Sequence, residues 1–168
     1  MDDVARAAAV SRQGLYLLFA NKEELFRRAL DHSLQGQLAS AITALSRTDA
    51  SFEERLIGAC EAWSGKFIGV LGADAADLMC ASTSLAGAAL AEHQWQFEQA
   101  LANALIASPL ACRCAAANLD VADLARALHA TARGLDWDKP AHPDLSGQTC
   151  WFSARFLGHC AALLGFHP

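Results

Sequence analysis

The chain has 168 residues, of which 54% are hydrophobic, and a formal net charge of −5. This length allows a buried core in one domain, or in a small domain followed by a larger one. The composition excludes a membrane-spanning helix, because no apolar run reaches about 18 residues, and a signal peptide, because acidic residues follow Met1. We therefore expect a cytoplasmic protein without a membrane partner.

Alanine and other aliphatic residues are abundant, and the chain contains only four prolines. No stretch shows the sustained alternation of β-branched and polar residues that is typical of strands. The sequence therefore predicts an all-α fold.

The start of the chain predicts two short helices and the beginning of a third. The first helix begins near Asp2 and ends before Ala9, where the helical spacing of apolar residues is interrupted. Ser11 and Asn21 each offer a side-chain oxygen to cap the free N–H groups of a following helix. The second helix has one apolar face that we expect to be buried, formed by Leu15, Leu18 and Phe19. Its open side carries Arg12, Gln13, Gly14 and Tyr16.

This order of a helix, a tight turn and a short second helix is typical of DNA-binding motifs. In such motifs the second helix, with polar residues near its N-terminus, enters the major groove of DNA. The segment VARAAAVSRQGLYLLFANKEELF resembles the helix-turn-helix signature of the TetR family of bacterial transcriptional regulators. That signature runs V-A-x-x-A-G-V-S and then Y-x-x-F-x-x-K-x-x-L. The resemblance implies contacts to DNA bases by Arg12, Gln13 and Gly14, and to phosphates by Ser11, Tyr16 and Lys22.

Two features depart from the family pattern. The family has glycine at the position of Ala9, and an alanine held at positive φ costs about 1 kcal/mol, so we expect a turn that is either different or strained. Family members also carry a whole helix before the one that begins near Asp2. That helix normally covers apolar residues of the kind found at Val4, Ala8, Leu15 and Phe19. We therefore expect either a start upstream of Met1 or a truncated DNA-binding head.

The acidic excess lies outside this N-terminal region. Residues 1–34 hold five basic and five acidic side chains, whereas the remainder holds eight basic and thirteen acidic ones. The distribution is compatible with a small, specific DNA footprint and excludes non-specific coating of nucleic acid.

Further helices are predicted by apolar spacing, capping residues and proline breaks. Their expected ranges are 21–44, 52–71, 74–82, 86–107, 121–135 and 146–164, with loops at 112–120 and 136–146. The last two helices are apolar on more than one face, which indicates burial on both sides. Packing against a twofold-related copy explains this pattern, and the resemblance also implies a homodimer.

Large side chains in the second region are candidates for the wall of an apolar cavity that binds a small-molecule effector: Trp63, Phe67, Met79, Trp95 and Phe97, with His129. The alternative is that each belongs to an ordinary hydrophobic core. Glu61 and Glu92 lie near them in the sequence and suit a cationic ligand.

No catalytic arrangement, metal site or cofactor motif has the required spacing, so we expect no enzyme, metal or cofactor. The six cysteines include no C-x-x-C pair, and most are expected to be buried apolar residues. Cys112 and Cys114 flank Arg113, and a redox role is an open alternative for this pair.

The sequence thus predicts a truncated helix-turn-helix head with a connector helix over residues 1–45. A helical-bundle ligand-binding and dimerisation domain is expected over residues 46–168. The favoured function is a DNA-binding transcriptional regulator, specifically a ligand-responsive repressor. The alternative is a dimeric small-molecule-binding protein whose incomplete head no longer binds DNA, and an enzyme on a helical scaffold is less favoured.

Overall fold

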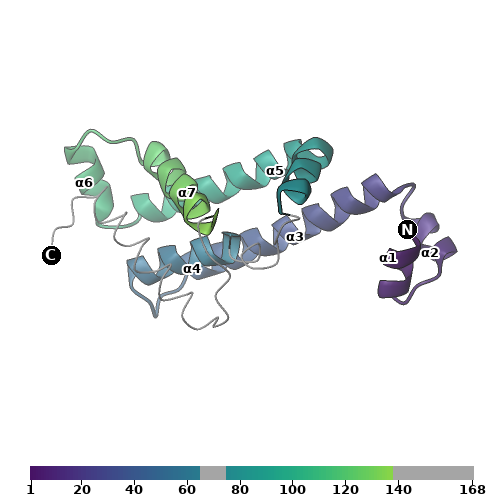
Figure 1. The fold of residues 1–168 in the computed structure, drawn as a ribbon. Helices are drawn as coiled ribbons and strands as arrows, with labels where there is room; N and C mark the ends of the chain where they lie inside the picture. Colours follow the sequence, from purple (N-terminus) through teal and green to yellow (C-terminus); the bar gives the residue numbers. More distant parts are fainter. Residues whose placement is uncertain (65–74, 138–168) are drawn as a thin grey trace.

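The protein is helical throughout the part that the structure describes (Figure 1). This computed structural model describes residues 1–64 and 75–137, except for the side chains of 75–79, 81–82 and 133–137. Within these ranges the helices are α1 (Asp2–Ala7), α2 (Arg12–Leu18), α3 (Lys22–Leu45), α4 (Phe52–Ser64), α5 (Ala75–Ile106), α6 (Leu110–Ala116) and α7 (Val121–Trp137). The predicted all-α fold is confirmed there.

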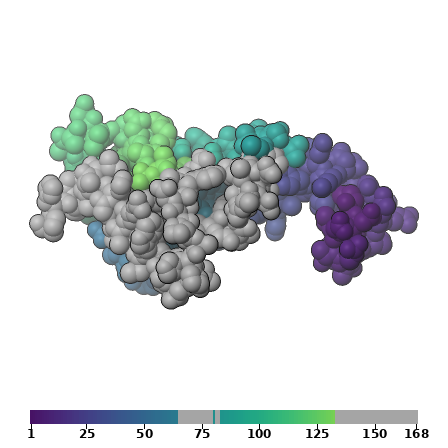
Figure 2. Space-filling model, in the orientation of Figure 1, coloured from purple at the N-terminus to yellow at the C-terminus, as the bar shows by residue number. Residues whose placement is uncertain are grey.

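The helices form two parts joined by α3. Helices α1 and α2, called here the N-terminal helix pair, lie at one end of α3 and project beyond the rest of the molecule (Figure 1, Figure 2). The remainder of α3 packs against α4 and α5, and α7 packs across α5 and α4. Helix α3 therefore belongs to both parts, as expected of a connector.

One apolar core holds the bundle together. Helix α3 contributes a stripe at three- and four-residue spacing, formed by Leu34, Leu38, Ala41 and Leu45. The other helices contribute residues that are almost fully buried, chiefly Cys60 and Trp63 of α4, Phe97, Leu101 and Leu105 of α5, Cys114 of α6, and Leu124, Ala125 and Leu128 of α7. The core lies at the end of α3 that is distant from the N-terminal helix pair.

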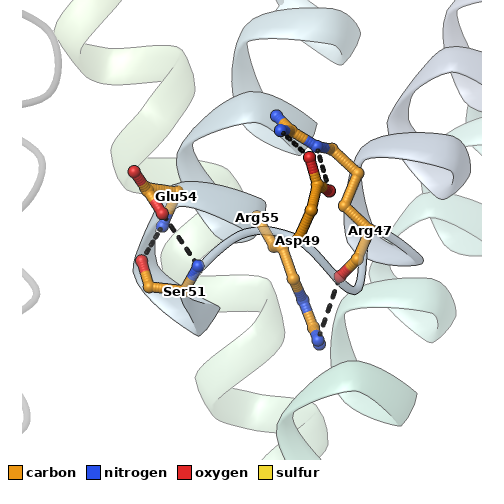
Figure 3. A network of polar contacts seen from close by, with 5 residues as sticks. All are labelled: Arg47, Asp49, Ser51, Glu54 and Arg55. Atoms are coloured by element: carbon orange, nitrogen blue, oxygen red, sulfur yellow. Dashed lines mark hydrogen bonds and ion pairs between the residues drawn. The ribbon is translucent and has the colours of Figure 1, made fainter.

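The turn between α3 and α4 is fixed by two polar contacts (Figure 3). The guanidinium of Arg47 donates two hydrogen bonds to the carboxylate of Asp49, at 2.8 and 3.0 Å, and this pairing lowers the pKa of Asp49. Ser51 and Glu54 form a capping box: the Glu54 N–H donates to Ser51 Oγ, and the Ser51 N–H donates to Glu54 Oε2. The second bond lowers the pKa of Glu54, so the cap is intact at neutral pH.

The predicted ranges 74–82 and 86–107 are two helical segments of α5 on either side of a kink at Ala86 (φ −141°, ψ 22°). One predicted boundary is wrong. The predicted loop 112–120 begins as helix α6, because Leu110 and Cys114 are spaced four residues apart and both are buried against the core. The exposed Cys112 lies two residues from the buried Cys114, on a different side of that helix.

Two residues that were expected to be buried, Trp95 and Leu18, lie on the surface. Trp95 is exposed because Phe97, two positions further along α5, points into the core, and residues one or two apart diverge on a helix. Leu18 is 72% exposed, and among the described helices the main contact of α2 is with the short α1.

The predicted loop 136–146, apart from the last residues of α7, and the predicted helix 146–164 lie outside the described residues. The second half of the predicted helix 52–71 does so as well. None of the described helices combines the length and the apolarity that crossing a lipid bilayer requires.

Candidate nucleic-acid interface

The turn between α1 and α2 is a Schellman motif centred on an alanine. The N–H of Val10 donates to the carbonyl of Ala5 at 3.0 Å, and the N–H of Ala9 donates to the carbonyl of Arg6 at 3.2 Å. This pattern places Ala9 in the left-handed region, with φ 55°. Of the two expected outcomes, the structure shows the strained one: the chain makes the turn without glycine.

Replacing Ala9 with glycine is expected to raise the free energy of unfolding by about 1 kcal/mol, because glycine adopts positive φ without a steric cost. Urea denaturation followed by circular dichroism measures the change. Asn118 is the matched control, since it occupies the equivalent position after α6 with φ 54°, and asparagine tolerates this region. Asn118→Gly should therefore gain less, and an Ala9→Gly gain no larger than that of the control would contradict the strain.

The start of α2 is set by Ser11 and Gly14. The Gly14 N–H donates to Ser11 Oγ at 2.9 Å, so the hydroxyl caps the helix as predicted. A β-carbon at position 14 would lie 3.1 Å from that oxygen, so glycine permits the close approach. The cap orients the first turn of α2, which carries the residues expected to approach bases.

Burial of one side chain fixes which face of α2 is open. Leu15 is 4% exposed, like Ala5 of α1, whereas Arg12, Gln13 and Tyr16 are all exposed. Arg12 and Tyr16 are four residues apart and share a face, with the Arg12 guanidinium carbon 5.7 Å from the centre of the Tyr16 ring. The polar side predicted for this helix is thus confirmed as solvent-facing.

Arg12 has an internal partner as well. Its Nη1 lies 3.2 Å from Asp2 Oδ1 at the start of α1. Both side chains are more than 60% exposed, so this ion pair is weak and breaks readily when a stronger anion approaches. The ion pair and the stacking on Tyr16 hold the guanidinium over the open face of α2.

The start of α3 completes this surface. The Asn21 side chain accepts the N–H of Glu24 at 2.8 Å, and the Glu24 carboxylate accepts the N–H of Ala20 at 2.9 Å. Lys22, in the first turn, is exposed. The structure therefore brings together the six residues predicted to contact DNA, Ser11, Arg12, Gln13, Gly14, Tyr16 and Lys22, in α2 and the adjoining turns; their individual contacts stay predictions.

The residues predicted to line an effector cavity are only partly assembled. Trp63 and Phe97 stack with their ring centres 4.9 Å apart, and His129 lies edge-on to both rings. These three side chains pack directly against one another in the core. Trp95 is 55% exposed, and Phe67 and the Met79 side chain lie outside what the structure describes.

A hydrogen-bonded chain runs through this aromatic cluster. The Trp63 indole N–H donates to His129 Nε2 at 3.1 Å, and His129 Nδ1 lies 2.8 Å from Glu98 Oε1. Because an indole nitrogen only donates, Nε2 must accept, so the imidazole proton is on Nδ1 and is donated to Glu98. Helices α4, α5 and α7 are thereby joined by one buried polar network.

Gln37 of α3 is another buried polar group, and its burial was not predicted from the sequence. Its side chain is 1% exposed, and its Oε1 has no hydrogen-bond partner within the described ranges. Its place in the core stripe of α3 was the available signal, since a glutamine there has to find partners.

The described ranges were also compared with the requirements of a metal site. No three histidine, cysteine or acidic side chains are grouped there in a way that holds a metal ion. Glu92, which was considered for a cationic ligand, is exposed and accepts a hydrogen bond from Gln96.

Comparison with known families identifies the N-terminal region. Residues 1–29 match the family described as bacterial regulatory proteins, tetR family. The match spans α1, the strained turn, α2 and the first two turns of α3, which is the surface described above. The chain matches no curated protein and no solved structure.

Proposed function

Because the chain belongs to the TetR family of bacterial regulatory proteins, we propose that it is a ligand-responsive repressor that binds a DNA operator as a homodimer. The family match supports the assignment as a DNA-binding transcriptional regulator with a helix-turn-helix. Regulators of this family are typically not enzymes. Our proposal adds that the protein represses transcription, that it responds to an effector and that it forms a dimer.

In this proposal residues 1–45 form the DNA-binding head with its connector, and residues 46–168 form the ligand-binding and dimerisation domain. Helix α2 enters the major groove, where Arg12, Gln13 and Gly14 approach base edges. Ser11, Tyr16 and Lys22 contact flanking phosphates and fix the register. The exposed polar face of α2 supports these roles, because such contacts require accessible side chains.

Dimerisation follows from the requirements of operator recognition. A single α2 reads only a few base pairs, so two heads related by a twofold axis are needed at successive major grooves, roughly 34–36 Å apart. The apolar pattern of residues 146–164 in the sequence supports a helix that meets its twofold copy.

Ligand response is supported by the buried polar groups around α3. Within the described residues, Oε1 of Gln37 is a buried acceptor without a hydrogen-bond partner, and such a group is costly unless a donor reaches it. We place the effector near Gln37 and the cluster of Trp63, Phe97 and His129, with Phe67, Met79 and Trp95 as the remaining proposed wall. An effector that prefers one position of α3 would shift the equilibrium between DNA-binding and non-binding states.

The decisive experiment is selection from sheared genomic DNA by the purified full chain at low salt, followed by sequencing and footprinting. We expect enrichment of a twofold-symmetric site upstream of a transcription unit and protection of that site in the footprint. Sedimentation analysis should show that the protein is a dimer. No enrichment over a non-binding control protein would overturn the proposal. A dimer that binds small molecules but no DNA would then establish the alternative function.

A further inference from the structure

A groove lies between α3 and the kinked part of α5, away from the aromatic cluster. It has a volume of about 590 Å³ and is lined by Arg27, Arg28 and Asp31 of α3 and by residues 83–89 of α5. We call it the kink groove. We infer that the kink groove is a binding site for a small organic anion that carries carboxylate or phosphate groups.

The shape of the groove comes from the kink. Ala86 departs from helical geometry, and the segment of α5 around it lies beside α3 (Figure 1). A β-carbon built on Gly87, the next residue, would meet no atom within 4 Å, so open space borders the kink. Helix kinks have local causes, and this one leaves room between two otherwise packed helices. A volume of this size lies within the usual range for small-molecule sites.

The charge of the groove favours an anion. Arg27 and Arg28 are exposed, and neither side chain forms an ion pair or a hydrogen bond within the described residues. The acidic member of the lining is already engaged: Asp31 accepts a hydrogen bond from Gln35 at 3.0 Å, and its other oxygen lies 3.6 Å from His93 Nε2. The lining therefore carries two positive charges, on Arg27 and Arg28, against the one negative charge of Asp31, and its net charge is positive.

The chemistry of the lining sets the class of ligand. Guanidinium groups bind carboxylates and phosphates through paired N–H donors, and two adjacent arginines suit a ligand with more than one anionic oxygen group. Leu85 and the alanines at the kink supply an apolar wall for the carbon skeleton. A small polycarboxylate or an organic phosphate meets both requirements.

The test uses citrate and inorganic phosphate as probes, titrated calorimetrically into the full chain without DNA at constant ionic strength. We expect saturable binding of at least one probe. Arg27→Gln and Arg28→Gln should each weaken it about tenfold, as the loss of a charge-assisted hydrogen bond implies. Gly87→Leu, which fills the groove without changing charge, should weaken binding comparably.

Arg126→Gln is the matched control, because Arg126 is an exposed arginine on α7, paired with Asp123 and outside the groove. It should leave probe binding within twofold. No saturable binding of either probe would overturn the inference. So would equal losses in the control and the groove variants, since these would indicate non-specific charge attraction. Thermal melting of each variant checks folding, and if Gly87→Leu fails to fold, the two arginine variants decide.

The tighter of the two probes identifies whether carboxylate or phosphate is the preferred group. If the arginine variants lose DNA affinity while neither probe binds, Arg27 and Arg28 are DNA contacts and the inference is wrong. Any effect of the anion on operator affinity rests on the proposed function. Binding itself is measured without DNA, so the inference and the proposed function fail independently.

Discussion

Replacing Phe97 with alanine is expected to lower the free energy of unfolding by about 3–5 kcal/mol. Phe97 is fully buried, and its ring stacks on Trp63 and meets the edge of His129. The substitution removes apolar area and aromatic contacts and leaves a cavity beside His129, which accepts the Trp63 indole N–H. Such a loss is a large part of the 5–15 kcal/mol that stabilises a typical domain.

Trp95→Ala is the matched control for this prediction. Trp95 is a larger aromatic residue on the same helix, two positions away, but 55% of it is exposed. We expect its removal to cost well under half as much as removal of Phe97, since less of its area leaves water on folding. Urea denaturation of the three proteins measures both changes. Equal losses would show that the two faces of α5 contribute alike and would contradict the described core.

Replacing Arg12 with alanine is expected to weaken binding to the selected operator by roughly 10- to 100-fold, or about 1–3 kcal/mol, if its guanidinium contacts a base. The variant should also discriminate less at one base pair of each half-site. Fluorescence anisotropy with the selected site, and with each single-base variant of it, measures both effects. Arg126→Ala, on the distant α7, should leave affinity unchanged.

A substitution of Asp2 can be tested in the same binding measurement. Its carboxylate pairs with Arg12 in the free protein, so DNA binding has to break that exposed pair. Asp2→Asn is expected to raise affinity slightly, because it removes both the competing partner and a negative charge near DNA phosphates. A uniform loss across all DNA sequences with Arg12→Ala would instead assign Arg12 to a phosphate.

Local signals explain why the N-terminal region was predictable from sequence. The caps at Ser11 and Asn21 act within three residues, and both are present in the structure. The strain at Ala9 was also predictable from the sequence. The family has glycine at this position, where the backbone adopts positive φ, and alanine adopts positive φ only at a steric cost. The connector helix was predicted to within about one residue at each end, because its apolar stripe and its cap agree.

Contacts between distant segments were not predictable in the same way. Trp63 and His129 are 66 positions apart, and only the packing of α4 on α7 makes them donor and acceptor. The kink groove likewise needs α3 and the kink of α5 side by side, and the spacing of apolar residues gives no sign of that juxtaposition. The burial of Trp95 was predicted wrongly because apolarity alone does not say which side of a helix faces the core.

The continuity of α3 has a mechanical consequence. Its 24 residues form a rod roughly 36 Å long at about 1.5 Å per residue, anchored in the bundle at one end and carrying the N-terminal helix pair at the other. Tilting such a rod by about 5° moves its free end by roughly 3 Å, close to the rise of about 3.4 Å between neighbouring base pairs. In a twofold dimer both rods would tilt together. In the proposed dimer, a rearrangement of the bundle smaller than one side chain would then be enough to put both α2 helices out of register with the double helix.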